Sequence, residues 1–277
     1  MADLYVTKSD GSTEAFREEK LTESLKRAGA RSDVAEKIVK DVLQNARDGV
    51  STQDIYQQAF RDLKHEHRPT AARYSLRRAL FDLGPTGFPF EDFIEALFKV
   101  EGYTTKVRQH VEGACVSHEL DVVATNDEEC VAVEVKFHNK IGTRTDTKVT
   151  LYMHARMHDI FEKRNEDPSS CPVNRALLVT NTKFTRTAIT YSECVGLELM
   201  GWDYPKNNGL ADRIEAHGLY PITTLTRISN AQKEALLREG IVLCRDLKEK
   251  QEALIHLGLS KDKAHQVIAE INELQSK

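Results

Sequence analysis

Two acidic residues and a lysine are spaced so that they could build a metal-dependent hydrolytic site. Asp121 lies in one apolar stretch, and Glu134 and Lys136 lie in the next, Val133-Glu134-Val135-Lys136. Residues two apart in a strand project from the same face, so Glu134 and Lys136 would point together. If the two strands pair, the carboxylates of Asp121 and Glu134 and the backbone carbonyl of Val135 would form a hard-oxygen site suited to Mg²⁺.

Such a site has the parts that phosphodiester hydrolysis requires. The cation lowers the pKa of a bound water and stabilises charge on the phosphorus, and the Lys136 ammonium would orient the water or the phosphate. The alternative is a solvated ion pair, since Glu-x-Lys is common on exposed strand faces.

The segments around these residues alternate between helical and strand-like patterns. Between residues 87 and 215, hydrophobic periodicity predicts an amphipathic helix at 90–98, strands at 103–108, 119–124, 130–137, 176–180 and 197–200, and helices near 147–163 and 185–195. This order predicts an α/β domain with a mixed sheet.

Different patterns flank this central segment. Residues 1–86 begin with a predicted β-hairpin, whose turn contains Asp10-Gly11, and continue with four short helices up to the break at Gly84-Pro85. Residues 216–277 are predicted to be wholly helical. The fold class is therefore multidomain α+β, with domains at 1–86, 87–215 and 216–277.

Composition excludes several classes of protein. The 277 residues are 40% hydrophobic and 30% charged, as in ordinary globular chains, and contain no apolar run long enough to span a membrane. No signal peptide is predicted at the start, and the five scattered cysteines predict reduced thiols, so we expect a cytoplasmic protein. The net charge of −4 comes mainly from the central segment and argues against a polycation.

The Asp121 and Glu134-x-Lys136 pattern resembles the PD-(D/E)xK nuclease superfamily, in particular its Mrr-like restriction endonuclease branch. In that branch a helix carrying a Glu precedes the sheet, which implies a catalytic role for Glu91 beside the other three residues. Leu120 stands where the superfamily name has Pro, and the metal site does not depend on that position. The resemblance implies a Mg²⁺-dependent endonuclease.

A later stretch, Leu178 to Thr185, looks like the following strand and helix of such nucleases. The resemblance implies that Asn181, Thr182 or Lys183 contacts the DNA backbone.

The N-terminal segment resembles an ATP-cone, a regulatory domain that binds ATP or dATP. The resemblance rests on Val6-Thr7-Lys8-Ser9-Asp10-Gly11, on Lys20-Leu21 and on a later helix with Arg77. It implies that Val6, Lys8, Gly11, Lys20 and Arg77 bind the nucleotide, and lysines near a helix start suit phosphate. Ser9 stands where the family usually has Arg. The alternative is an inert helical cap with solvated lysines.

The C-terminal segment resembles helix-hairpin-helix units, which grip DNA through backbone amides. Two copies of the pattern are visible, one around Gly240-Ile241 and one around Gly258-Leu259. Because this segment is nearly neutral, a protein-protein module is an open alternative. A basic face around Arg61, Lys64 and Arg68 could also meet phosphate, although such charge runs are usually solvated.

These observations predict a cytoplasmic Mg²⁺-dependent endodeoxyribonuclease that ATP or dATP regulates, acting in defence against foreign DNA or in repair. Its partners would be DNA and a nucleoside triphosphate, without a membrane, and it would form a homo-oligomer, a dimer or tetramer. The alternative is a nucleotide-responsive DNA-binding regulator whose nuclease fold is not catalytic.

Overall fold

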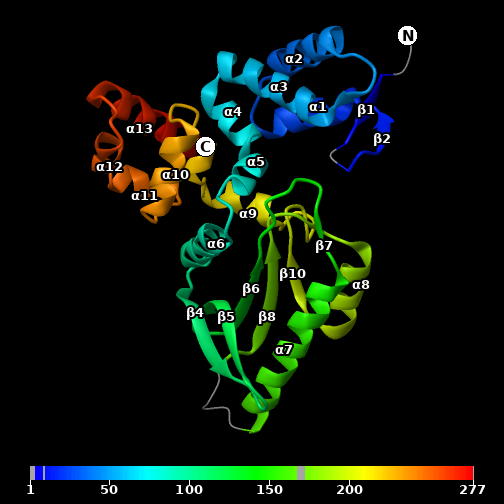
Figure 1. Cartoon of the computed structure of the whole chain (residues 1–277), viewed down its shortest axis with the longest axis vertical. Coiled ribbons are helices and arrows are strands. Elements are labelled where there is room, and N and C mark those ends of the chain that lie inside the picture. The colour runs from blue at the N-terminus through cyan, green and yellow to red at the C-terminus, as the bar shows by residue number, and fades with distance from the viewer. Residues whose placement is uncertain (1–3, 9, 167–171, 277) are drawn as a thin grey trace. The chain divides into compact units, whose positions relative to one another are not determined.

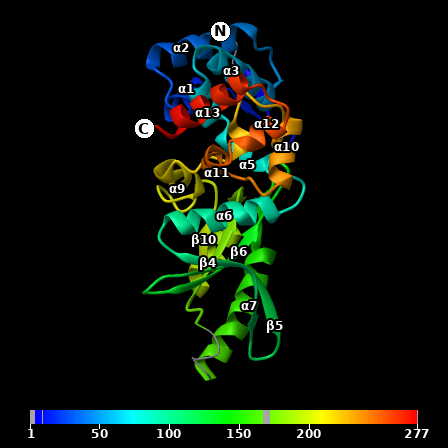
Figure 2. The ribbon, with the colours of Figure 1, turned by 90° about the vertical axis from the view of Figure 1, so that its left-hand side faces the viewer.

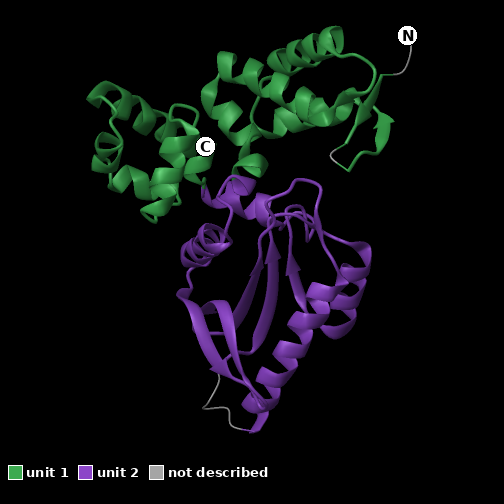
Figure 3. Ribbon diagram, in the orientation of Figure 1, with its two compact units in different colours: residues 1–79, 220–277 green, residues 80–219 purple. Residues whose placement is uncertain are grey.

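The computed structural model describes residues 4–8, 10–166 and 172–276. The chain divides into two compact units, one formed by Met1–Ala79 with Tyr220–Lys277 and the other by Leu80–Leu219 (Figure 3). The N-terminal and C-terminal segments therefore belong to one unit, whereas the central segment forms a unit by itself. Ser9 and Cys171, which the sequence analysis singled out, lie outside the described residues.

The N-terminal half of the first unit is a small sheet covered by helices. Its elements are β1 (Tyr5–Thr7), β2 (Thr13–Ala15), α1 (Glu18–Arg27), α2 (Ser32–Asn45), β3 (Val50–Ser51), α3 (Thr52–Glu66), α4 (Arg68–Tyr74) and α5 (Leu76–Phe81), whose last two residues fall in the second unit. Strand β1 pairs antiparallel with β2 and parallel with β3. Gly11 in the hairpin turn has φ +82°, which glycine adopts without a steric penalty. The predicted hairpin is confirmed.

The C-terminal half of this unit is helical in its described residues. It consists of η1 (Ile222–Thr224), α10 (Asn230–Arg238), α11 (Cys244–Glu249), α12 (Glu252–His256) and α13 (Lys261–Gln275). Helix α13 packs against α4, and Figure 2 shows α12 beside α13. The Arg73 guanidinium of α4 donates to the backbone carbonyls of Glu273, Leu274 and Ser276, which caps the end of α13. These bonds help to join the two segments into one unit.

The second unit is built on a five-stranded mixed sheet, as the sequence predicts. Its strands are β4 (Thr104–Glu112), β5 (Ser117–Thr125), β6 (Cys130–Lys136), β8 (Arg175–Thr180) and β10 (Glu198–Met200), in the spatial order β10-β8-β6-β5-β4. The β4–β5 and β5–β6 pairs are antiparallel, and the β6–β8 and β8–β10 pairs are parallel. A separate two-stranded ribbon pairs β7 (Arg144–Thr145) with β9 (Lys183–Phe184).

Helices cover both faces of this sheet (Figure 1). Helix α6 (Phe88–Val100) lies on one face and contacts β4, β5 and β6, with Phe90, Phe93 and Leu97 fully buried. Helices α7 (Thr147–Glu166) and α8 (Arg186–Val195) lie on the other face, where Met153 and Ile160 pack against strand residues. Helix α9 (Leu210–His217) contacts α6. Because successive side chains of a strand point to opposite faces, β6 contributes residues to the core on each side of the sheet.

The structure bears on the predictions about membrane-spanning segments and about the cysteines. No helix within residues 4–8, 10–166 and 172–276 is long and apolar enough to cross a membrane. The four cysteines that the structure describes, Cys115, Cys130, Cys194 and Cys244, are free thiols.

Candidate functional site

Asp121 is held at the point where β5 and β6 stop pairing. The β5–β6 ladder runs from Thr125 opposite Cys130 to Val122 opposite Val133. One residue further on, Oδ2 of Asp121 accepts a hydrogen bond from the backbone N–H of Val135 at 2.7 Å. The carboxylate thus takes the place of a strand carbonyl, which fixes Asp121 beside the end of β6.

Glu134 projects from β6 toward α7. Its Oε2 accepts a hydrogen bond from Nη1 of Arg156 at 2.6 Å, and the two side chains are only 19% and 10% exposed. The second Nη of Arg156 donates to the backbone carbonyl of Glu119 on β5. Helix α7 therefore places a buried guanidinium across both strands that carry the predicted metal ligands.

Glu91 reaches the same region from α6. Its Oε2 lies 3.3 Å from Nε of Arg108, and the same guanidinium donates to Asp92 at 2.9 Å. Arg108 has φ +52° within β4, a conformation that costs a non-glycine residue about 1–2 kcal/mol. It lies between the register pairs Val107–Val122 and Gln109–Leu120, so the distorted backbone faces the strand segment that carries Asp121.

The charge of Asp121 affects the other two carboxyl groups, Glu91 and Glu134. Burial raises the pKa of Glu134 to about 7, and the nearby charge of Asp121 raises it as well, against the opposing effects of Arg156 and Lys136. Burial and then Asp121 also raise the pKa of Glu91. Burial raises the pKa of Asp121, against the hydrogen bond from Val135 and the charge of Arg156. Asp121 thus opposes the ionisation of both Glu91 and Glu134.

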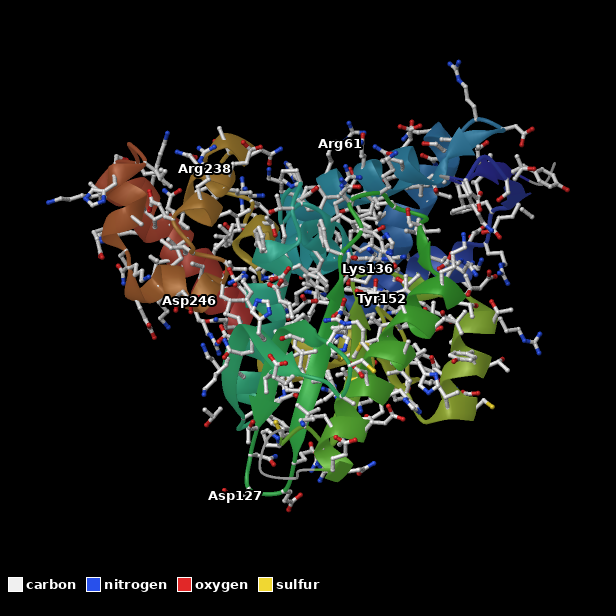
Figure 4. The ribbon with its side chains drawn as sticks, turned by 60° about the horizontal axis from the view of Figure 1, so that its bottom comes forward. Arg61, Asp127, Lys136, Tyr152, Arg238 and Asp246 are labelled. Atoms are coloured by element: carbon white, nitrogen blue, oxygen red, sulfur yellow. The ribbon has the colours of Figure 1, made fainter. Side chains whose placement is uncertain are left out.

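Lys136 ends β6 and is exposed. It lies two residues after Glu134, and its charge favours the ionised form of that carboxyl group. Figure 4 labels Lys136 on β6 and Tyr152 on α7, whose ring centre lies 5.4 Å from the Arg156 guanidinium carbon. The structure therefore brings all four predicted catalytic residues to one end of the β5–β6 pair and its α6 cover.

The donor chemistry fits Mg²⁺, although the side chains do not by themselves form a closed metal site. Among the residues that the structure describes, no group of three or more His, Cys, Asp or Glu side chains is arranged to hold a metal ion. Oδ1 of Asp121 and Oε1 of Glu134 are not used in the hydrogen bonds given above. With the Val135 carbonyl they are hard oxygen donors, and a divalent cation would relieve the repulsion between the two carboxylates.

Sequence reasoning missed two arginines that contact this site, Arg108 and Arg156. Arg108 stands in a strand pattern, and only its positive φ and its two acidic neighbours on α6 distinguish it. Arg156 occupies a position of α7 that is buried beside Met153 and Met157. A charged residue on the apolar face of a helix is the sequence signal that could have indicated a buried ionic partner.

The predicted nucleotide-binding residues are brought together only in part. The Nζ atoms of Lys8 and Lys20 lie 2.7 Å and 3.2 Å from the carboxylate of Glu14, so both lysines meet on the hairpin. Gly11 forms the turn beside them, and Val6 is buried in β1 as part of the core. Arg77 lies on α5, whereas Lys8 and Lys20 meet at Glu14.

Of the three residues offered as alternative DNA contacts after β8, two are buried and one is partly exposed. Asn181 and Thr182 are fully buried. Asn181 exchanges two hydrogen bonds with the backbone of His138, and thereby fixes the chain just after β6. Lys183 is half-exposed and ion-paired with Asp203. Of the three, Lys183 therefore stays the candidate for a DNA contact, because a buried amide that bonds backbone looks, in sequence, like a polar surface residue.

Comparisons with known proteins find family models for both flanking segments and relatives of about two thirds of the chain. The model of the ATP cone domain matches residues 4–82, and the model described as AF1548-like, C-terminal, matches residues 220–275. An uncharacterized protein of Archaeoglobus fulgidus is 40% identical over 179 residues, which are 64% of this chain and 97% of that protein. The crystal structure of the protein of unknown function AF1548 is 37% identical, with a TM-score of 0.54, over 69% of this chain and 98% of that one.

Proposed function

Since the chain belongs to the AF1548-like family and carries an ATP cone domain at its N-terminus, we propose that it is a Mg²⁺-dependent endodeoxyribonuclease controlled by ATP or dATP. The central unit would be a nuclease domain of the PD-(D/E)xK type. The observation that carries this proposal is the hydrogen bond from the Val135 N–H to Asp121, because it fixes Asp121 beside Glu134 and Lys136 at one strand end.

Each residue of the site would have a distinct role. Asp121, Glu134 and the Val135 carbonyl would hold the Mg²⁺, which when bound lowers the pKa of water and neutralises charge on the phosphate. Lys136 would position the attacking water and the phosphate next to them. Glu91 of α6 would assist the metal shell. Arg108 would keep the Glu91 carboxylate oriented through the 3.3 Å contact between Nε and Oε2.

The flanking segments would supply control and substrate binding. The ATP cone domain would bind ATP or dATP where Lys8 of the hairpin and Lys20 of α1 both contact Glu14. The C-terminal helices would hold the DNA backbone through helix-hairpin-helix-like turns at Gly240 and Gly258, both of which have positive φ. Nucleotide binding would change the assembly of subunits, and so pair the two active sites needed to cut both strands.

Cleavage of supercoiled plasmid with Mg²⁺ tests the catalytic proposal. We expect nicking or linearisation by the wild type, and a loss of about 100-fold or more in Lys136→Ala and in Asp121→Asn. Asp121→Asn can still accept the Val135 hydrogen bond, so it removes the charge while retaining the strand contact. The matched control is Lys106→Ala, which removes an exposed lysine from β4 of the same sheet.

The proposal fails if wild type and Lys136→Ala leave the plasmid intact with and without ATP or dATP, or if both cut it equally. If neither protein cuts the plasmid but both still bind DNA, the result favours the alternative function.

That alternative is a nucleotide-responsive DNA-binding regulator with a non-catalytic nuclease fold. The observation that favours it is the buried ion pair between Glu134 and Arg156, because Arg156 already neutralises one of the proposed metal ligands. Mg²⁺ titration calorimetry separates the two functions, since the nuclease needs a Mg²⁺ site that Glu134→Gln abolishes and the regulator does not.

A further inference from the structure

A second strongly basic site lies in the first unit, away from the hairpin lysines. It is a pocket of about 350 Å³ whose walls come from the ATP cone domain and from the C-terminal helices. Lys64 of α3 and Arg68 of α4 line one side. Arg227, which precedes α10, and Lys263 of α13 line the other.

The four cations of this pocket form no ion pair with any acidic residue that the structure describes. None of the residues that line it is Asp or Glu, and none of the four cations forms an ion pair in the part of the chain that the structure describes. This differs from the hairpin, where Glu14 neutralises both lysines. Like charges that converge without a counter-ion repel one another, so the pocket attracts an anion.

Neutral hydrogen-bond partners hold the two arginines in place. Nη1 of Arg68 donates to Oγ1 of Thr226 at 3.1 Å, and Nη1 of Arg227 donates to Oε1 of Gln266 at 2.9 Å. Thr226 is itself anchored, because its N–H and hydroxyl both donate to Oε1 of the buried Glu270. The arginines are therefore oriented in advance, which lowers the entropy cost of binding a ligand.

The side chains of the two lysines, Lys64 and Lys263, are not held by such hydrogen bonds. Among the described residues, neither ammonium group, that of Lys64 or that of Lys263, takes part in the hydrogen bonds that hold the arginines. Lysine is a flexible point charge, so both ammonium groups can turn toward a bound anion.

We infer that this pocket binds a small polyphosphate-bearing ligand, separately from the nucleotide at the hairpin. The ligand class follows from the charge, since four cations exceed what one phosphate group neutralises. A small ligand is favoured over the DNA backbone because the volume of about 350 Å³ falls within the range of small-ligand pockets. Because its walls come from both segments, the ligand would hold the ATP cone domain against the C-terminal helices.

Calorimetric titration of the full chain with inorganic tripolyphosphate tests this inference. The titration uses a Lys8→Gln/Lys20→Gln background, so that phosphate binding at the hairpin does not contribute. We expect Lys64→Gln/Lys263→Gln to weaken tripolyphosphate binding at least about tenfold, because two of the four charges are lost. The control, Lys40→Gln/Lys248→Gln, removes two exposed lysines of the same unit and should change the affinity less than about twofold.

The inference is overturned if the Lys64→Gln/Lys263→Gln variant binds tripolyphosphate as tightly as the control does. It is also overturned if a DNA duplex, and not tripolyphosphate, loses affinity in that variant. Circular dichroism of each variant checks the fold, which should be unchanged because neither lysine anchors another element. No cleavage is measured, so the outcome is independent of the proposed nuclease activity.

Discussion

At the scale of single residues, the site is defined by how buried charges are compensated. Glu134 is surrounded by Asp121, which opposes its ionisation, and by Arg156 and Lys136, which favour it. Burial is the larger effect, and it leaves the carboxyl group with a pKa of about 7. This group would therefore change its charge near neutral pH, where its affinity for a cation would change as well.

Glu134→Gln should make the free energy of unfolding less dependent on pH. The pKa of Glu134 is raised on folding from 4.5 to about 7, so its contribution is fully present below pH 4.5 and is lost as the pH rises to about 7. We measure the free energy of unfolding of both proteins by urea titration at pH 5 and at pH 8. Relative to the wild type, the variant should be about 1–3 kcal/mol more stable at pH 8 than at pH 5. A difference that is the same at both pH values would contradict the pKa shift.

At the scale of elements, Asp159 joins helix α7 to the β4–β5 hairpin. Its carboxylate accepts hydrogen bonds from the N–H groups of Cys115 and Val116, and its Oδ2 lies 2.7 Å from Nε2 of His118. These contacts, with the His118 contact the largest, lower the pKa of Asp159 to about 2. Since α7 also carries Arg156, this joint fixes the position of the guanidinium that reaches Glu134.

Gly113→Ala should disrupt this joint. A Cβ at Gly113 would lie 2.0 Å from Oδ2 of Asp159 and 2.7 Å from the Val116 carbonyl oxygen, so the carboxylate and the turn would both have to move. We expect the midpoint of thermal unfolding to fall by about 2–6 °C. The matched control is Ala114→Ser in the same turn.

A double variant shows whether the loss acts through Asp159. If it does, Gly113→Ala should cost less in an Asp159→Ala background than in the wild type, because the clashing carboxylate is already absent. Equal losses in both backgrounds would place the effect in the backbone alone.

At the scale of the whole molecule, the ATP cone domain is the candidate for control. Lys8→Gln/Lys20→Gln should weaken the binding of ATP and dATP by about tenfold or more, since both lysines meet at the hairpin and would contact phosphate. Fluorescence titration with a labelled ATP analogue measures this, with Lys40→Gln as the control. The variant should remain folded, because exposed ion pairs contribute little stability.

Size-exclusion chromatography with light scattering tests the link to assembly. We expect ATP or dATP to change the molar mass of the wild type and to leave that of the Lys8→Gln/Lys20→Gln variant unchanged. Identical profiles of the wild type with and without nucleotide would rule out control through oligomerisation.

The sequence by itself determined the order and type of most elements, because their signals are local. Alternating and helical periodicity predicted β5, β6, α6 and α7, and the Asp10-Gly11 turn predicted the first hairpin. The residues on which the ATP-cone resemblance rests also lie within the segment that matches that family, 4–82. Strand β4 extends to Glu112, beyond the predicted end at 108, because pairing with β5 continues past the distorted Arg108.

The tertiary structure decided which charges meet and which segments share a core. The sequence could place Asp121 and Glu134 on two strands, but their position at the end of the ladder depends on where pairing stops. Arg108 and Arg156 come from β4 and α7. The basic pocket combines Lys64 and Arg68 with Lys263, at least 195 residues later in the sequence. Such contacts depend on how elements pack in three dimensions, which periodicity within one element cannot specify.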